Sequence, residues 1–146
     1  MVFANGTVTI KEMIGRQSSA KYKDMLSFFA VPAIELEYGK DYIFQQDNCS
    51  IHVSSEMKKY FTENKISLLN WPACSPDQNM VGNVWKMASD HLYSAKPPRS
   101  VQELRKKVFE AFDNINHEKT AEIRNLFKTF TRRVAKVIEL NKNLIN

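Results

Sequence analysis

The sequence has no apolar stretch long enough to cross a membrane, which argues against a membrane-spanning protein. Met1–Gly15 lacks both the basic start and the continuous apolar run of a signal peptide. Cysteine is scarce: Cys49 and Cys74 are the only two, and both lie beside turn-forming residues. Without a secretion signal we expect free thiols rather than a disulfide. Neither cysteine belongs to a paired Cys/His spacing, which argues against a zinc site.

Apolar side chains are not scarce, and they exclude a disordered chain. Hydrophobic residues make up 43% and aromatic residues 11% of the 146 residues. This length and composition are typical of one compact domain with its own core. We therefore predict a single domain over residues 1–146.

Acidic residues are outnumbered by basic ones, 16 against 21, and the sequence pI is about 9.2. This excess permits a polyanionic partner without requiring one. Four basic residues lie on one face of the last predicted helix: Lys128, Arg132, Arg133 and Lys136. Such a face could hold nucleic-acid phosphates, or it could be the solvated side of an amphipathic helix, and the pattern favours neither.

The order of predicted elements is typical of an α/β domain. Asn5-Gly6 is a strong two-residue hairpin signal, and Thr7–Ile14 alternates polar and apolar residues as a strand does. Apolar runs before turn residues predict two buried strands, at Tyr42–Phe44 and Ile66–Trp71. Helical spacing and capping residues predict helices over Ala20–Leu36, Ser54–Asn64, Gln78–Tyr93, Ser100–Ile115 and Lys119–Asn141, with Pro32 interrupting the first.

Three linked blocks carry the most specific signal: Phe44–His52 (FQQDNCSIH), Leu69–Asn79 (LNWPACSPDQN) and Val81–Trp85 (VGNVW). Their residues and intervals resemble the catalytic region of Tc1/mariner DNA transposases, and the resemblance runs from Asn5-Gly6 to about Ile138. It implies an α/β, ribonuclease-H-like (DDE transposase/integrase) domain with C-terminal helices. Members of this family cut and join DNA with two metal ions held by three acidic side chains.

The resemblance leaves one acid in place and removes another. Asp47 matches the family's second acid, and 34 residues separate it from Gly82, which stands at the position of the third. Glycine has no side-chain donor for a metal ion, so we expect Asp47 to be a vestigial catalytic residue and a weak metal ligand. His52 matches a family histidine, but a packing or helix-start role is the simpler interpretation.

The first acid is expected to be missing for a different reason. In the family it lies on the strand before the one that leads into the Asn-Gly turn, and here Met1 stands only four residues before Asn5. We therefore expect a truncated domain without the first strand and most of the second. Either the remaining strands close up, or a homodimer or another protein partner completes the sheet. Restoring a glutamate at position 82 is then not expected to restore cutting.

These observations predict a transposase-derived pseudoenzyme. It would serve as a protein-interaction or dimerisation module, or as a nucleic-acid-binding module, without DNA-cutting activity. The alternative is a metal-dependent DNA strand-transfer fragment that needs acids from another chain. No cofactor is required, and Mg²⁺ or Mn²⁺ would matter only for residual activity. Family resemblance implies a nuclear location and DNA as a partner.

Overall fold

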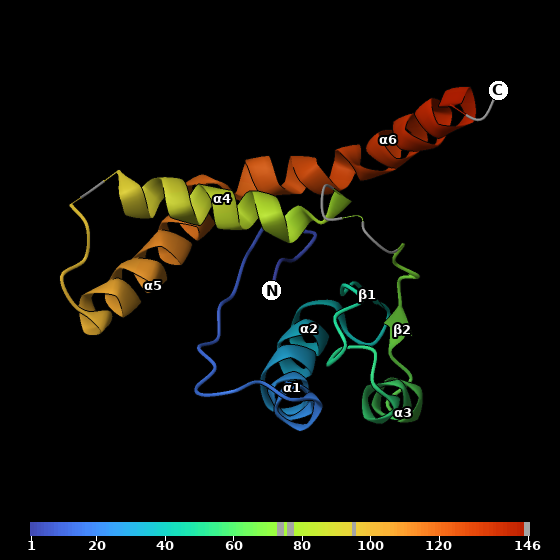
Figure 1. Ribbon diagram of the computed structural model, residues 1–146, viewed down its shortest axis with the longest axis horizontal. Coiled ribbons are helices and arrows are strands. Elements are labelled where there is room, and N and C mark those ends of the chain that lie inside the picture. Colours follow the sequence, from blue (N-terminus) through green and yellow to red (C-terminus); the bar gives the residue numbers. More distant parts are fainter. Residues whose placement is uncertain (73–74, 76–77, 95, 145–146) are drawn as a thin grey trace. The chain divides into compact units, whose positions relative to one another are not determined.

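The computed structural model describes residues 1–72, 75, 78–94 and 96–144 (Figure 1). The chain packs as two compact units. Unit 1 consists of Met1–Lys11 and Pro76–Asn146, and unit 2 consists of Glu12–Ser75. The expected single domain over residues 1–146 stays a prediction. Among the described residues, no helix is both long and apolar enough to cross a membrane.

Unit 2 begins with one helical rod in three parts, drawn in blue to teal in Figure 1. These are α1 (Ser19–Met25), the π-helical turn η1 (Leu26–Ala30) and α2 (Val31–Tyr38). The predicted interruption at Pro32 lies in the first turn of α2, where a missing N–H removes little. The π-turn precedes it, and the Val31 N–H donates to the Leu26 carbonyl five residues back. The rod thus continues past a proline that would otherwise clash with the preceding turn.

The sheet of unit 2 has two parallel strands, β1 (Ile43–Phe44) and β2 (Ser67–Leu68). Both strands were predicted, but their predicted burial is wrong. Ile43 is 70% exposed and Leu68 is 41% exposed. Parallel strands are usually covered on both faces by other elements. Here the sheet has only two strands among the described residues, and the side chains of Ile43 and Leu68 on its faces reach solvent.

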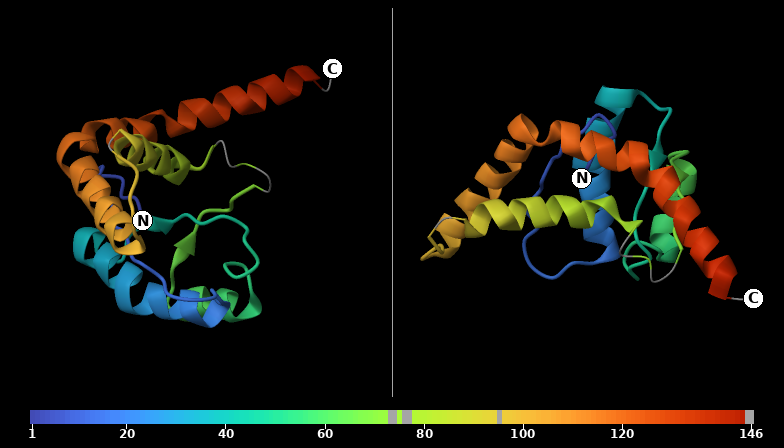
Figure 2. Two further views of the ribbon diagram at one scale, coloured as in Figure 1. Left: turned by 60° about the vertical axis from the view of Figure 1, so that its left-hand side comes forward. Right: turned by 90° about the horizontal axis from the view of Figure 1, so that it is seen from above.

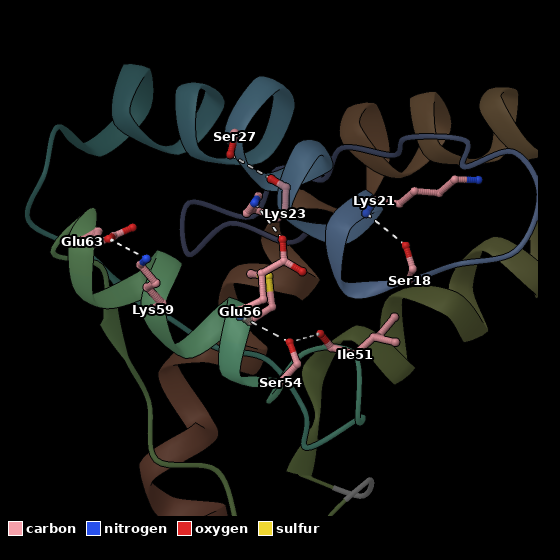
Figure 3. Close-up of polar contacts among 10 residues, drawn as sticks. Ser18, Lys21, Lys23, Ser27, Ile51, Ser54, Glu56, Lys59 and Glu63 are labelled. Atoms are coloured by element: carbon pink, nitrogen blue, oxygen red, sulfur yellow. Dashed lines mark hydrogen bonds and ion pairs between the residues drawn. The ribbon is translucent and has the colours of Figure 1, made fainter.

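The helix between these strands, α3 (Ser55–Glu63), is predicted correctly, and Ser54 is its N-cap. Met57 and Phe61 on its inner face are buried. α3 is tied to α1 by an ion pair in which Lys23 Nζ lies 2.7 Å from Glu56 Oε1 (Figure 3). Each partner is 39% exposed, so this ion pair joins the two helices at the surface and adds little to their packing.

The described residues of unit 1 form three helices and an N-terminal hairpin, seen from two further sides in Figure 2. The helices are α4 (Met80–Tyr93), α5 (Val101–Glu118) and α6 (Thr120–Leu144). All three agree with the predicted ranges to within a few residues. Their apolar stripes meet Val8 of the hairpin in one core, whose helical members are Val84, Ala88, Ala111, Phe112, Ile115 and Ile123.

The hairpin turns at Asn5-Gly6 as predicted, with Phe3 N–H donating to the Thr7 carbonyl at 2.9 Å. The strand expected over Thr7–Ile14 is wrong, because regular pairing is confined to one antiparallel bridge, Val2 to Val8. The backbone groups of Val8 that a further strand would pair with are bonded by a side chain instead. Asn116 of α5 accepts from the Val8 N–H at 2.8 Å and donates to the Val8 carbonyl at 2.9 Å.

Candidate functional site

Asp47 lies in the loop that follows β1, three residues after the strand ends. Its side chain is 54% exposed, and one carboxylate oxygen, Oδ1, has two partners. The Cys49 amide donates to it at 3.1 Å, and His52 Nδ1 lies 2.7 Å from it. The loop therefore turns back so that Cys49 and His52 both lie close to one carboxylate.

The charge on Asp47 is stabilised locally. Partial burial raises the pKa of this carboxyl group, but the hydrogen bonds from the Cys49 amide and from His52, with the attraction of the His52 ring, outweigh it. The net effect holds the pKa of Asp47 below its usual range. Asp47 is therefore an ionised acceptor at neutral pH.

His52 is held by Tyr22, which the sequence did not single out, and by Gln46 from the first of the three blocks. Its ring packs against the ring of Tyr22 from α1, with centroids 4.2 Å apart. The Tyr22 hydroxyl donates to Gln46 Oε1 at 2.9 Å, and Gln46 Nε2 donates to the His52 carbonyl at 3.1 Å. Burial, followed by the charges of Asp47 and Cys49, raises the pKa of Tyr22, so its hydroxyl stays a donor. His52 thus has a packing contact, as expected, and faces Asp47 as well.

Cys49 completes the cluster. It is a free, exposed thiol, as expected, while Cys74 lies outside the described residues. The ligand atoms of Asp47, Cys49 and His52 all lie within 4.8 Å of one another. Within the described ranges no other three residues of the His, Cys, Asp and Glu types meet this closely. The set contains one carboxylate, a thiol and an imidazole, which does not fit a pair of Mg²⁺ ions, because Mg²⁺ selects oxygen ligands.

Gly82 is the third residue of α4 and belongs to unit 1, whereas Asp47 belongs to unit 2. Asn79 caps this helix, its side chain accepting from the Val81 N–H at 3.3 Å. A Cβ atom built on Gly82 meets nothing within 4 Å, and the residue is exposed. Packing therefore does not require glycine here, and a larger side chain has room.

The predicted basic face lies on α6, but its four members differ. Lys128, Arg132 and Lys136 are exposed and follow one another at intervals of four residues. Arg133 is half-buried, and its guanidinium donates to the Leu126 carbonyl at 3.3 Å. Arg133 is thus engaged with its own helix. The exposed face that remains for a phosphate partner is the stripe Lys128, Arg132 and Lys136.

One further arginine extends this stripe toward the start of α6. Arg124 precedes Lys128 by four residues and is exposed. Its Nε donates to the Asn5 carbonyl in the hairpin at 3.1 Å. The four-residue spacing was the signal that could have found it. Arg124 stabilises the contact between the hairpin and α6, with part of its guanidinium left at the surface.

Comparisons with known proteins agree on one kind of protein, although no family model matches the chain. The chain is 30% identical over 138 residues to the Tc3 transposase of Caenorhabditis elegans, which covers 94% of this chain and 41% of that protein. It is 28% identical over 93 residues to the Tcb1 transposase of Caenorhabditis briggsae, or 64% of this chain and 34% of that protein. The chain therefore spans about two-fifths of the Tc3 transposase.

The fold comparison points the same way. The structure of the Mos1 transposase catalytic domain with Raltegravir and Mn superposes with a TM-score of 0.58 at 18% identity. The match covers 82% of this chain and 64% of that one. At this identity the likeness concerns the fold, which is ribonuclease-H-like, as the family resemblance implied.

Proposed function

We propose that this chain, which is a Tc1/mariner transposase-like domain, binds the DNA backbone and does not cut DNA by itself. Gly82 supports the second part of this proposal, that the chain does not cut DNA by itself. A two-metal phosphoryl-transfer site needs several carboxylates to hold its cations. Position 82 offers no side-chain oxygen, although the structure leaves room for one. In the described residues around Asp47, the neighbouring donors are a thiol and an imidazole instead.

The first part, binding of the DNA backbone, is supported by the stripe Lys128, Arg132 and Lys136. Its three cations are exposed on α6, and the helix rises about 6 Å between successive members. Each cation that neutralises a phosphate releases a counterion, so affinity falls with salt by a slope of about −0.9 per contact. Three contacts predict a slope of about −2.7 in log affinity against log salt. Binding would then weaken roughly 40-fold between 50 and 200 mM salt, on the order of a modest non-specific DNA binder.

Fluorescence anisotropy of a labelled duplex, measured over a salt series in EDTA, tests this binding. The double variant Arg132→Ala/Lys136→Ala should lower the slope magnitude by about 1.8, because two phosphate contacts are lost. The matched control is Lys58→Ala/Lys106→Ala, which removes the same charge from two other helices. Equal losses in both variants would refute a role for the stripe, since only net charge would then matter.

Absence of cutting is tested separately with supercoiled plasmid in Mg²⁺ or Mn²⁺. We expect no metal-dependent nicked product from the chain alone. Nicking that disappears in Asp47→Ala would overturn the non-cutting proposal. It would support instead a strand-transfer fragment in which another chain supplies the remaining acids.

A second candidate function is dimerisation of this chain through the small sheet. Each of β1 and β2 has one neighbour among the described strands, and Ile43 is 70% exposed on β1. Main-chain groups on such an edge can pair with a strand of a second copy. Ile43→Lys should then shift the mass measured by light scattering at micromolar concentration from dimer to monomer. The control Leu36→Lys, on exposed α2, should not. A wild-type chain that stays monomeric would exclude this candidate.

A further inference from the structure

We propose that Asp47, Cys49 and His52 form a binding site for a zinc-type divalent cation within this one chain, which revises the expectation from the cysteine spacing that there is no zinc site. The observation is the convergence of three different ligand atoms within 4.8 Å of one another. In tetrahedral zinc sites, oxygen and nitrogen ligands lie about 2.0–2.2 Å and sulfur about 2.3 Å from the ion. Those bond lengths place neighbouring ligand atoms roughly 3.3–3.5 Å apart. The three side chains therefore need to move by only about an ångström to enclose an ion.

The donor set selects the kind of cation. A thiolate and an imidazole are preferred by Zn²⁺, and by Co²⁺ as its spectroscopic substitute, whereas Mg²⁺ and Ca²⁺ prefer oxygen. Cys49 and Asp47 are exposed, so an ion can reach them from solvent. Three protein ligands leave the fourth tetrahedral position for water. This chemistry differs from the all-carboxylate requirement of two-metal DNA cutting, and the site does not depend on the proposed DNA binding.

The backbone of the loop holds the three ligands at this spacing. The Cys49 carbonyl accepts from the His52 N–H at 2.8 Å and from the Val53 N–H at 3.2 Å, which closes one turn between the two ligands. The Cys49 N–H bonds Asp47 Oδ1 and fixes the carboxylate on the same side. Such local bonds order the ligands before an ion arrives, which lowers the entropy lost on binding.

The ring of His52 also has a supporting contact. Tyr22 packs against it at a centroid distance of 4.2 Å, which limits how far the imidazole can swing. Groups that orient metal-binding histidines commonly change metal affinity by about 10–100-fold when they are removed. On binding, the ion takes the place between His52 Nδ1 and Asp47 Oδ1, now 2.7 Å apart, and the Cys49 thiol proton leaves to solvent.

The site is tested by titrating the full chain with Co²⁺ under anaerobic, reducing conditions. A thiolate ligand gives a near-ultraviolet charge-transfer band, and tetrahedral coordination gives strong visible bands. We expect saturation at one ion per chain, displacement by stoichiometric Zn²⁺ and no displacement by millimolar Mg²⁺. Saturation at half an ion per chain would overturn the proposal, because the ligands would then come from two copies. Failure to saturate at any ratio would overturn it too.

Variants assign the ligands. Cys49→Ser should abolish the charge-transfer band, and His52→Gln should keep the band but weaken Co²⁺ binding by about 10-fold or more. The matched controls are Cys74→Ser and His91→Gln, which remove the other cysteine and an exposed histidine of α4. Both controls should bind as the parent does. Loss of the band in Cys74→Ser, or its survival in Cys49→Ser, would refute the assignment. Circular dichroism confirms that each variant is folded.

Discussion

Gly82→Glu probes the position at which the family resemblance in the sequence places the third acid. The glycine is the third helical residue of α4, and Asn79 is the N-cap. A glutamate in this place completes a capping box, because its carboxylate can reach back to the N-cap backbone N–H. It also places a negative charge at the positive end of the helix. The built Cβ meets nothing within 4 Å, so no steric cost opposes these gains.

The expected gain is about 1 kcal/mol of unfolding free energy. Glycine lies about 1 kcal/mol and glutamate roughly 0.4 kcal/mol below alanine in helix propensity. A carboxylate in the first turn adds about 0.3–1 kcal/mol. The helix end stabilises the ionised form, so the pKa of the introduced carboxyl group in the folded chain should lie below its unfolded value of about 4.3. The added stability is then present above that pH and is lost as the pH falls through the folded pKa.

Urea unfolding followed by circular dichroism measures the effect. With a slope of about 2 kcal/mol per molar, the midpoint should rise by about 0.5 M at pH 7. Gly82→Gln is the matched control, since it has the same length without the charge, and it should gain less and show no loss near pH 4. A lower midpoint for Gly82→Glu would refute the reasoning, because it would mean that the glycine is required. Equal gains for the two variants would refute the electrostatic part.

Two further changes test how unit 1 is held together, both by urea unfolding. Asn116→Ala leaves the Val8 N–H and carbonyl without their partner, and Val8 is only 4% exposed. We therefore expect the unfolding free energy to fall by roughly 2–4 kcal/mol. A fall under about 0.5 kcal/mol would show that water replaces the amide. Gly6→Ala brings a Cβ to 2.2 Å from the Thr120 carbonyl oxygen at φ +93°, whereas Gly39→Ala meets nothing within 4 Å at φ +68°. Gly6→Ala should therefore cost more than the roughly 1–3 kcal/mol of backbone strain alone, and equal losses would contradict the close approach.

Helices and their caps could be predicted because their signals are local. Ser18, Ser54 and Ser100 each accept from a backbone N–H of the helix that follows. Each signal lies within one turn of the residue that it affects, so the order of residues contains it. Ser100 and Glu103 have the spacing of a capping box, in which the glutamate accepts from the N-cap N–H, but here the Glu103 carboxylate accepts from the Arg99 N–H at 2.7 Å. That choice depends on the path of the preceding chain.

Burial of the strands could not be predicted in the same way. An apolar run such as Tyr42–Phe44 indicates a strand, but whether it is covered depends on what lies beside it. The structure pairs it with one neighbour, and Ile43 stays 70% exposed. The prediction of a strand from Thr7 was wrong for a related reason. Asn116, far away in sequence, satisfies Val8 in place of a partner strand.

For the candidate site too, some features follow from the sequence and others only from the tertiary structure. The sequence by itself determined that Asp47 follows a strand, that Gly82 brings no carboxylate to its helix and that the last helix is basic, because these facts depend on residue identity and short spacing. Only the tertiary structure decided that Cys49 and His52 close around Asp47 with Tyr22 against the ring, and that Arg133 turns to its own helix. Loop conformation and packing bring such side chains together, and neither follows from periodicity.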